Sequence, residues 1–141
     1  MTYWLLDTGP LVAALNRGDP QHERCARVLS GFSGTLLTTG AVVTEAMHFI
    51  GGQAKGAEVL VEFLDDAQIG IRDCFAPEQL RAASRLMGRY ADTPMDFADA
   101  TLVLLAEETG LDKILTLDER GFRTYRRHGS RRFRLVLDKI D

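Results

Sequence analysis

Short apolar runs alternate with longer stretches of helical periodicity along the chain. Residues 3–6 and 35–39 are apolar or β-branched and stop at turn or small residues, a pattern typical of buried strands. Further short strands are predicted on the same grounds at 69–72, 113–117 and 133–137.

Between these strands, apolar residues recur at helical spacing. Helices are predicted over six stretches: 11–15, 20–29, 41–50, 54–66, 77–90 and 96–109. Thr8 or Gly9 is expected to cap the first helix, with Pro10 in its first turn. The last helix is apolar nearly all round and is closed by Gly110. Because strands alternate with helices, we predict an α/β fold whose parallel sheet is covered on both faces.

The size and composition of the chain are those of one globular domain. It has 141 residues, 45% of them hydrophobic, and no polar low-complexity tract. No apolar run reaches the ~18 residues that suggest a membrane span, and the first residues lack the basic region of a secretory signal. We therefore expect a single domain over 1–141, soluble and cytoplasmic, with Cys25 and Cys74 as free thiols.

Four carboxylates interrupt segments that are otherwise apolar. Asp7 and Asp118 end predicted strands, whereas Glu45 and Asp99 have apolar neighbours on predicted helices. An ionised carboxylate on a buried face is costly, so proteins keep one there only if it is protonated, paired or bound to metal. For Asp7 or Asp118 taken alone, a second interpretation is open, because a carboxylate before a turn can cap a helix.

Taken together, the acids predict a metal site. The carboxyl ends of strands in an open α/β sheet line one crevice, and Asp7 and Asp118 lie at two such ends. Like charges brought together repel, and a divalent cation removes that penalty. Oxygen donors without a Cys/His cluster suit Mg²⁺ or Mn²⁺. Asp96, three residues before Asp99, is either a further ligand or an acid that satisfies the start of its helix.

The same acids carry a resemblance to a known family. The stretches concerned are LLDTGPL at 5–11, VTE at 43–45, MDFADA at 95–100 and LTLD at 115–118, with Phe122 close behind. In this order and spacing they resemble the PIN-domain ribonucleases, and most closely the VapC-like toxins of type II toxin–antitoxin systems. The resemblance spans essentially the whole chain and implies a three-layer α/β/α sandwich with a central parallel sheet.

The resemblance also implies which residues act. Four acids match the acidic positions of the family: Asp7, Glu45, Asp99 and Asp118. Asp96 matches an extra acid found in part of the family, and the hydroxyls of Thr8 and Thr116 match groups beside the site. Such proteins cleave RNA with Mg²⁺ or Mn²⁺, usually form dimers, and are inhibited by a small antitoxin protein.

Each acid can be given an expected role on this basis. Asp7 and Asp99 are expected to bind metal directly, and Asp118 to bind a second ion or hold its waters. Glu45 is expected to bind metal or to orient the attacking water. Asp96 is a candidate additional ligand.

A basic cluster near the end of the chain predicts an RNA contact. Seven arginines lie between residues 120 and 134, with three aromatic residues among them: Phe122, Tyr125 and Phe133. Basic groups hold phosphates, and aromatic rings stack on unpaired bases. Four arginines are therefore expected to bind RNA: Arg120, Arg123, Arg126 and Arg127. The alternative is a solvated loop with core aromatics.

Other interpretations of the acids fit less well. A haloacid-dehalogenase-type phosphotransferase needs a second acid two residues after the first, where this chain has Gly9. A response-regulator receiver needs an acidic pair near the first strand end, which does not fit either. Two alternatives stay open: a non-catalytic RNA- or protein-binding module with a vestigial site, and a PIN nuclease in general RNA processing.

Overall fold

A computed structural model describes residues 1–139. Its central sheet has the order β3-β2-β1-β4-β7, and each neighbouring pair is parallel. The strands of this sheet are β1 (Tyr3–Leu6), β2 (Thr35–Thr39), β3 (Gly70–Arg72), β4 (Lys113–Leu115) and β7 (Arg134–Leu135). A separate antiparallel hairpin pairs β5 (Arg126–Arg127) with β6 (Arg131–Arg132).

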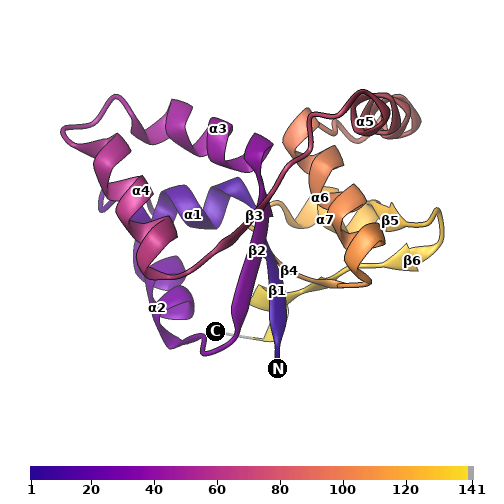
Figure 1. The fold of residues 1–141 in the computed structure, drawn as a ribbon. Coiled ribbons are helices and arrows are strands. Elements are labelled where there is room, and N and C mark those ends of the chain that lie inside the picture. Colours follow the sequence, from indigo (N-terminus) through magenta and orange to yellow (C-terminus); the bar gives the residue numbers. More distant parts are fainter. Residues whose placement is uncertain (140–141) are drawn as a thin grey trace.

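Helices cover both faces of the sheet. They are α1 (Thr8–Leu15), α2 (His22–Gly31), α3 (Gly40–Ile50), α4 (Gly56–Asp66), α5 (Pro77–Arg89), α6 (Phe97–Thr109) and α7 (Glu119–Thr124), followed by the 3₁₀ turn η1 (Val136–Lys139). Figure 1 shows α1 to α4 on one side of the sheet and α5 to α7 on the other. The predicted three-layer α/β/α sandwich around a parallel sheet is confirmed.

The core lies between these layers. Leu5 and Leu6 of β1 and Ile114 and Leu115 of β4 are fully buried side by side in the middle of the sheet. Each such side chain contributes about 1.5–3 kcal/mol when it leaves water. Helix α6 is apolar nearly all round because it packs against β2, α3 and α5 at once.

The order of strands fixes where a site can form. From β1 the chain continues to β2 on one side of it, whereas β4 pairs on the other side. The carboxyl ends of β1 and β4 therefore flank the point where strand order reverses, which is where open α/β sheets bind ligands. Asp7 directly follows β1, and Asp118 lies just beyond β4.

Several predicted boundaries differ from the structure. Asp7, rather than Thr8 or Gly9, caps α1. The second helix begins at His22, because the N–H of Gln21 bonds the Asp19 carboxylate in a preceding turn. The stretch 133–137 contains only a two-residue strand before it coils into η1. Within residues 1–139, no helix is long and apolar enough to cross a membrane.

Candidate active site

Asp7 links the end of β1 to the start of α1. Its Oδ1 accepts the backbone N–H of Thr8 at 2.8 Å, which makes the residue the N-cap of the helix. Its Oδ2 accepts the hydroxyl of Thr116 at 2.7 Å. The residue is only 7% exposed. Two donors thus fix both carboxylate oxygens of a nearly buried acid at the carboxyl edge of the sheet.

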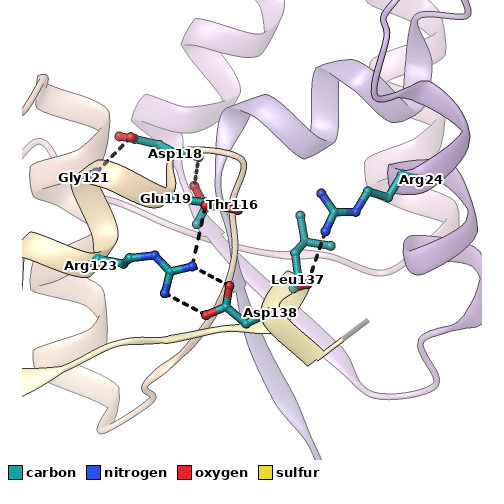
Figure 2. A network of polar contacts seen from close by, with 8 residues as sticks. All are labelled: Arg24, Thr116, Asp118, Glu119, Gly121, Arg123, Leu137 and Asp138. Carbon is teal, nitrogen blue, oxygen red and sulfur yellow. Dashed lines mark hydrogen bonds and ion pairs between the residues drawn. The ribbon is translucent and has the colours of Figure 1, made fainter. Parts of the chain in front are cut away.

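Thr116 connects Asp7 to the start of α7. Its hydroxyl accepts the N–H of Asp118 at 3.0 Å, and Oδ1 of Asp118 accepts the N–H of Gly121 at 3.0 Å (Figure 2). A hydroxyl carries one proton, and that of Thr116 is donated to Asp7. Asp118 is itself exposed and acts as the N-cap of α7.

Asp99 reaches the same region from the first turn of α6. It forms a reciprocal cap with Asp96: Asp96 Oδ1 accepts the N–H of Asp99 at 2.8 Å, and Asp99 Oδ2 accepts the N–H of Asp96 at 3.2 Å. Asp99 is 9% exposed, whereas Asp96 is exposed. Both interpretations of Asp96 therefore remain compatible with its position, because it caps the helix and also faces the site.

The acids meet at one cavity of about 340 Å³, which we refer to as the acid pocket. It is lined by Asp7, Thr8, Gly9, Glu45, Asp96, Asp99, Leu117 and Asp118. Glu45 is half-buried and comes from α3. The structure thus brings together the four predicted catalytic acids, Asp96 and Thr8. Thr116 does not line the pocket but contacts it through its hydrogen bond to Asp7.

Burial and mutual repulsion raise the pKa values of carboxyl groups in the acid pocket. Burial raises the pKa of Asp7 to about 6, against the hydrogen bonds from Thr116 and Thr8, and the charges of Asp96 and Asp118 add to the rise. The pKa of Asp99 is raised to about 8, first by burial and then by the charges of Asp7 and Asp96.

The pKa of Glu45 is raised in the same way, by burial and then by the charges of Asp96 and Asp7. The raised pKa values of Asp7, Asp99 and Glu45 therefore mean that all three carboxyl groups resist ionisation. A cation placed among them would favour the ionised forms.

The donor set fits a hard divalent cation. The polar side chains of the pocket are carboxylates and the Thr8 hydroxyl, so they offer oxygen donors alone. The Thr8 Oγ1 atom is buried and has no hydrogen-bond partner among residues 1–139, an uncommon state that a ligand or its waters would relieve. Among residues 1–139, no three His, Cys, Asp or Glu side chains already stand together as a closed metal cluster. The carboxylates surround the cavity and do not converge on one point.

Of the arginines predicted to bind RNA, two are tied to neighbours on α7 and η1 or to the backbone. Arg123 donates to both carboxylate oxygens of Asp138, at 3.0 and 2.7 Å, and lies 3.6 Å from Glu119 (Figure 2). The guanidinium of Arg126 turns back onto the backbone and donates to three carbonyls, those of residues 123–125.

Arg127 and Arg120 are opposites in exposure. Arg127 is 9% exposed, donates to the carbonyl of Arg132 and lies over the ring of Phe133 at 6.0 Å. Arg120 is exposed on α7, and Arg131 and Arg132 are exposed on the hairpin. The RNA role of this cluster stays a prediction. Its exposed arginines include Arg131 and Arg132, which are not among the four that were expected to bind RNA.

The expectation for the interleaved aromatic residues is wrong. Phe122, Tyr125 and Phe133 are buried, and the rings of Tyr125 and Phe133 pack edge-on against Phe122 at 5.1 and 5.3 Å. They belong to the core and are not available to stack on bases. Two rings that sequence analysis did not select, Phe75 and Phe97, lie next to the acid pocket instead.

Known proteins are similar to this chain in sequence and in fold. The PIN domain profile matches residues 4–127. Ribonuclease VapC26 of Mycobacterium tuberculosis (strain ATCC 25618 / H37Rv) is 27% identical over 135 residues, covering 94% of this chain and 98% of that protein.

Solved structures extend the likeness to three dimensions. VapC20 of M. tuberculosis, a sarcin-ricin loop cleaving toxin, superposes with a TM-score of 0.74 at 17% identity, covering 84% of this chain and 91% of that one. VapBC2 from Rickettsia felis, bound to a DNA fragment from their promoter, matches with a TM-score of 0.66 at 15% identity, covering 95% and 98% of the two chains. At these identities, the structural matches support the fold.

The profile match is the finding that decides the family. It runs from β1 to β5 and therefore includes every element that contributes an acid to the pocket. Because residues 4–127 make up most of the chain, the protein belongs to the PIN domain family.

Proposed function

We propose that this chain is a Mg²⁺- or Mn²⁺-dependent endoribonuclease that hydrolyses RNA phosphodiester bonds. The observation that carries the proposal is the acid pocket, where the nearly buried Asp7 and Asp99 line one cavity together with Glu45 and Asp118. Acids gathered in this way need a cation to be ionised together. The similar protein VapC26 is a ribonuclease, and the structurally similar VapC20 is a sarcin-ricin loop cleaving toxin.

The proposed roles follow the placement of each residue. Asp7 and Asp99 would hold the cation directly, and Asp96 and Asp118 would complete its surroundings from the exposed side of the pocket. When bound, the cation would supply a water of lowered pKa and would stabilise the negative charge that develops on the phosphate oxygens and the leaving oxygen. Glu45, on the α3 wall, would orient the attacking water.

Two threonines support the acids. Thr116 holds Asp7 in one orientation through its 2.7 Å hydrogen bond. Thr8 presents a hydroxyl that has no other partner among the described residues, so it can hydrogen-bond a water in the pocket. Both act on the position of the ligands and not on the RNA itself.

The RNA backbone would be held by the exposed arginines beside α7 and the β5–β6 hairpin. We propose Arg120, Arg131 and Arg132 as direct phosphate contacts, with Arg123 joining them by exchanging Asp138 for a phosphate. Arg126 and Arg127 would instead stabilise the conformation of the backbone between α7 and the hairpin, because their guanidinium groups are already hydrogen-bonded to backbone carbonyls.

We further propose that the chain is the toxin of a toxin–antitoxin pair, works as a homodimer and is inhibited by a small antitoxin protein. The similarity to VapC26 and VapC20 supports the toxin role. On α4, Val59 and Val61 are 40% and 55% exposed, and exposed apolar side chains of this kind suit a protein partner.

A cleavage assay tests the proposed function. Purified protein is incubated with total RNA in Mn²⁺ or in EDTA, beside an Asp7→Asn variant purified in the same way, and fragment ends are sequenced. We expect defined new ends from the wild type in Mn²⁺ only and none from Asp7→Asn. RNA binding without cleavage would favour the non-catalytic module, and cleavage by Asp7→Asn would remove the acid pocket from the reaction.

A further inference from the structure

A second cavity adjoins the acid pocket, and we infer that it binds an unpaired nucleobase of the RNA next to the scissile phosphate. This inference rests on the proposed ribonuclease function. The cavity measures about 460 Å³. Its walls include Thr44, Glu45, His48, Phe75, Asp96 and Phe97. We refer to it as the aromatic pocket.

The two cavities share residues. Glu45 and Asp96 line both, so the aromatic pocket begins where the acid pocket ends. A phosphodiester joins two nucleosides, and a substrate whose phosphate lies among the acids must place a base on each side within one nucleotide. The aromatic pocket is the neighbouring hollow into which one of those bases can turn.

The pocket offers a ring that is already held in place. Phe75 is 50% exposed, and its ring lies 6.1 Å from that of Phe97 with a tilt of 32°. A side chain at Gly40 would come within 3.0 Å of the Phe75 ring, so the bare glycine leaves room for the ring to lie over the start of α3. The N–H of Phe75 bonds Asp73 Oδ1 at 3.1 Å. An exposed ring fixed in this way is a surface on which bases stack.

The charge of the lining selects a base and not a phosphate. Its acids are Glu45 and Asp96, and within the described chain its lining includes no lysine or arginine. A phosphate would be repelled, whereas a neutral base can stack on Phe75 and hydrogen-bond to acidic or imidazole side chains. His48 is exposed at this pocket and can donate or accept at a base edge.

Binding measured without catalysis tests the pocket directly. Short single-stranded oligoribonucleotides are titrated in EDTA with wild type, Phe75→Ala and Phe49→Ala, using fluorescence anisotropy. Phe49 is the matched control, because it is a phenylalanine 58% exposed on α3, the helix that contributes Glu45 and His48 to the aromatic pocket, but it lines neither cavity. One base stacked on an aromatic ring corresponds to about a tenfold change in affinity. We expect that loss for Phe75→Ala, none for Phe49→Ala, and recovery in Phe75→Trp.

Cleavage of modified substrates locates the base. Oligoribonucleotides with an abasic residue on either side of the mapped cleavage point are compared in Mn²⁺. The abasic substitution should lower kcat/KM of the wild type about tenfold on one side of the cleavage point and not on the other. On that abasic substrate, Phe75→Ala should cleave with the same kcat/KM as the wild type, because the base that the ring binds is already missing. Thermal unfolding of Phe75→Ala and Phe75→Trp at the Tm of the wild type verifies that the fold is kept.

The outcomes separate this inference from the proposed function. Cleavage that is equal in wild type, Phe75→Ala and Phe49→Ala, with equal effects of abasic residues, would overturn the aromatic pocket and leave the nuclease intact. Base-dependent binding without any cleavage would do the reverse. A change from dimer to monomer in Phe75→Ala, with unchanged RNA affinity, would show that this face binds a second copy of the chain and would also overturn the inference.

Discussion

The hydroxyl of Thr116 donates to Asp7 Oδ2 at 2.7 Å while it accepts the N–H of Asp118 at 3.0 Å. This contact joins residues 109 positions apart in the chain and ties the end of β1 to the segment after β4. The hydrogen bond lowers the pKa of Asp7, against the larger effect of burial. Thr116 therefore sets both the orientation of Asp7 and the ease with which it ionises.

Thr116→Val should raise the Mn²⁺ concentration needed for cleavage and should also lower the free energy of unfolding. It removes the donor to Asp7 and leaves the Asp118 N–H without its partner, at a cost of about 1–3 kcal/mol in the free energy of unfolding. Because the pKa of Asp7 rises further, more Mn²⁺ should be needed for half-maximal RNA cleavage. Thr116→Ser keeps the hydroxyl and should behave as the wild type. An unchanged Mn²⁺ requirement in Thr116→Val would show that Thr116 does not position Asp7.

The stability of the metal-free protein should fall as the pH rises. Asp7 and Asp99 have pKa values of about 6 and about 8 in the folded protein, above their ordinary value of 3.8. Between about pH 4 and 8 the folded chain therefore binds more protons than the unfolded chain, and the free energy of unfolding decreases with pH. The change at Asp7 alone, from 3.8 to about 6, is worth on the order of 3 kcal/mol.

Urea unfolding in EDTA between pH 5 and 8.5 measures this slope. In Asp99→Asn the amide cannot ionise, so the decline should be shallower and the variant should be more stable than the wild type at pH 8. Two results would contradict the assigned pKa directions. One is a free energy of unfolding of the wild type that increases from pH 5 to 8, and the other is a pH dependence of that free energy that is the same in Asp99→Asn.

RNA affinity should depend on the exposed arginines of the hairpin. Replacing Arg131 and Arg132 by Ala should weaken binding of a single-stranded oligoribonucleotide in EDTA and reduce the slope of log K against log salt. The reduction should be about 1.4, or roughly 0.7 for each lost phosphate contact. Replacing Arg81 and Arg85, which are also exposed but lie on α5, is the control and should leave the slope unchanged. Equal slopes in the two double variants would rule out the hairpin as the RNA contact.

Arg127→Ala should act on stability instead. Its guanidinium is buried, bonds the Arg132 carbonyl and covers the Phe133 ring, so its removal loses packing as well as charge. Thermal unfolding should show a lowered Tm, whereas the salt slope of RNA binding should stay near that of the wild type. A reduced salt slope of RNA binding with an unchanged Tm would show that Arg127 contacts the RNA.

Local patterns were enough to predict most of the framework. The strands 3–6 and 35–39 have the bounds that the sequence predicts, because their apolar and β-branched runs end at Asp7 and Gly40. The acids were found for a related reason, since a carboxylate inside an apolar segment is anomalous wherever the segment lies. The convergence of Asp7 and Asp118 then follows from the parallel sheet.

The surroundings of the acids depend on contacts that no local pattern contains. The sequence shows a cluster of arginines but not that the guanidinium of Arg126 folds onto its own backbone. Phe122 lies in α7 and Tyr125 directly follows that helix, and the packing of their rings is a burial that the basic neighbours concealed. Phe75 and Phe97 lie in separate segments, and their shared cavity arises when α3, α6 and the loop after β3 come together.

Calorimetric titration of Mn²⁺ at pH 7, repeated in buffers of different ionisation enthalpy, measures cation binding and the accompanying proton release together. The carboxyl groups of Asp7 and Asp99, whose pKa values are raised in the metal-free protein, are expected to ionise when a cation enters the acid pocket. The wild type should bind Mn²⁺ and release on the order of one proton for each ion, and Asp99→Asn should lose most of both signals. Absence of Mn²⁺ binding by the wild type, or binding with no proton release, would show that the acid pocket is not a cation site of this kind.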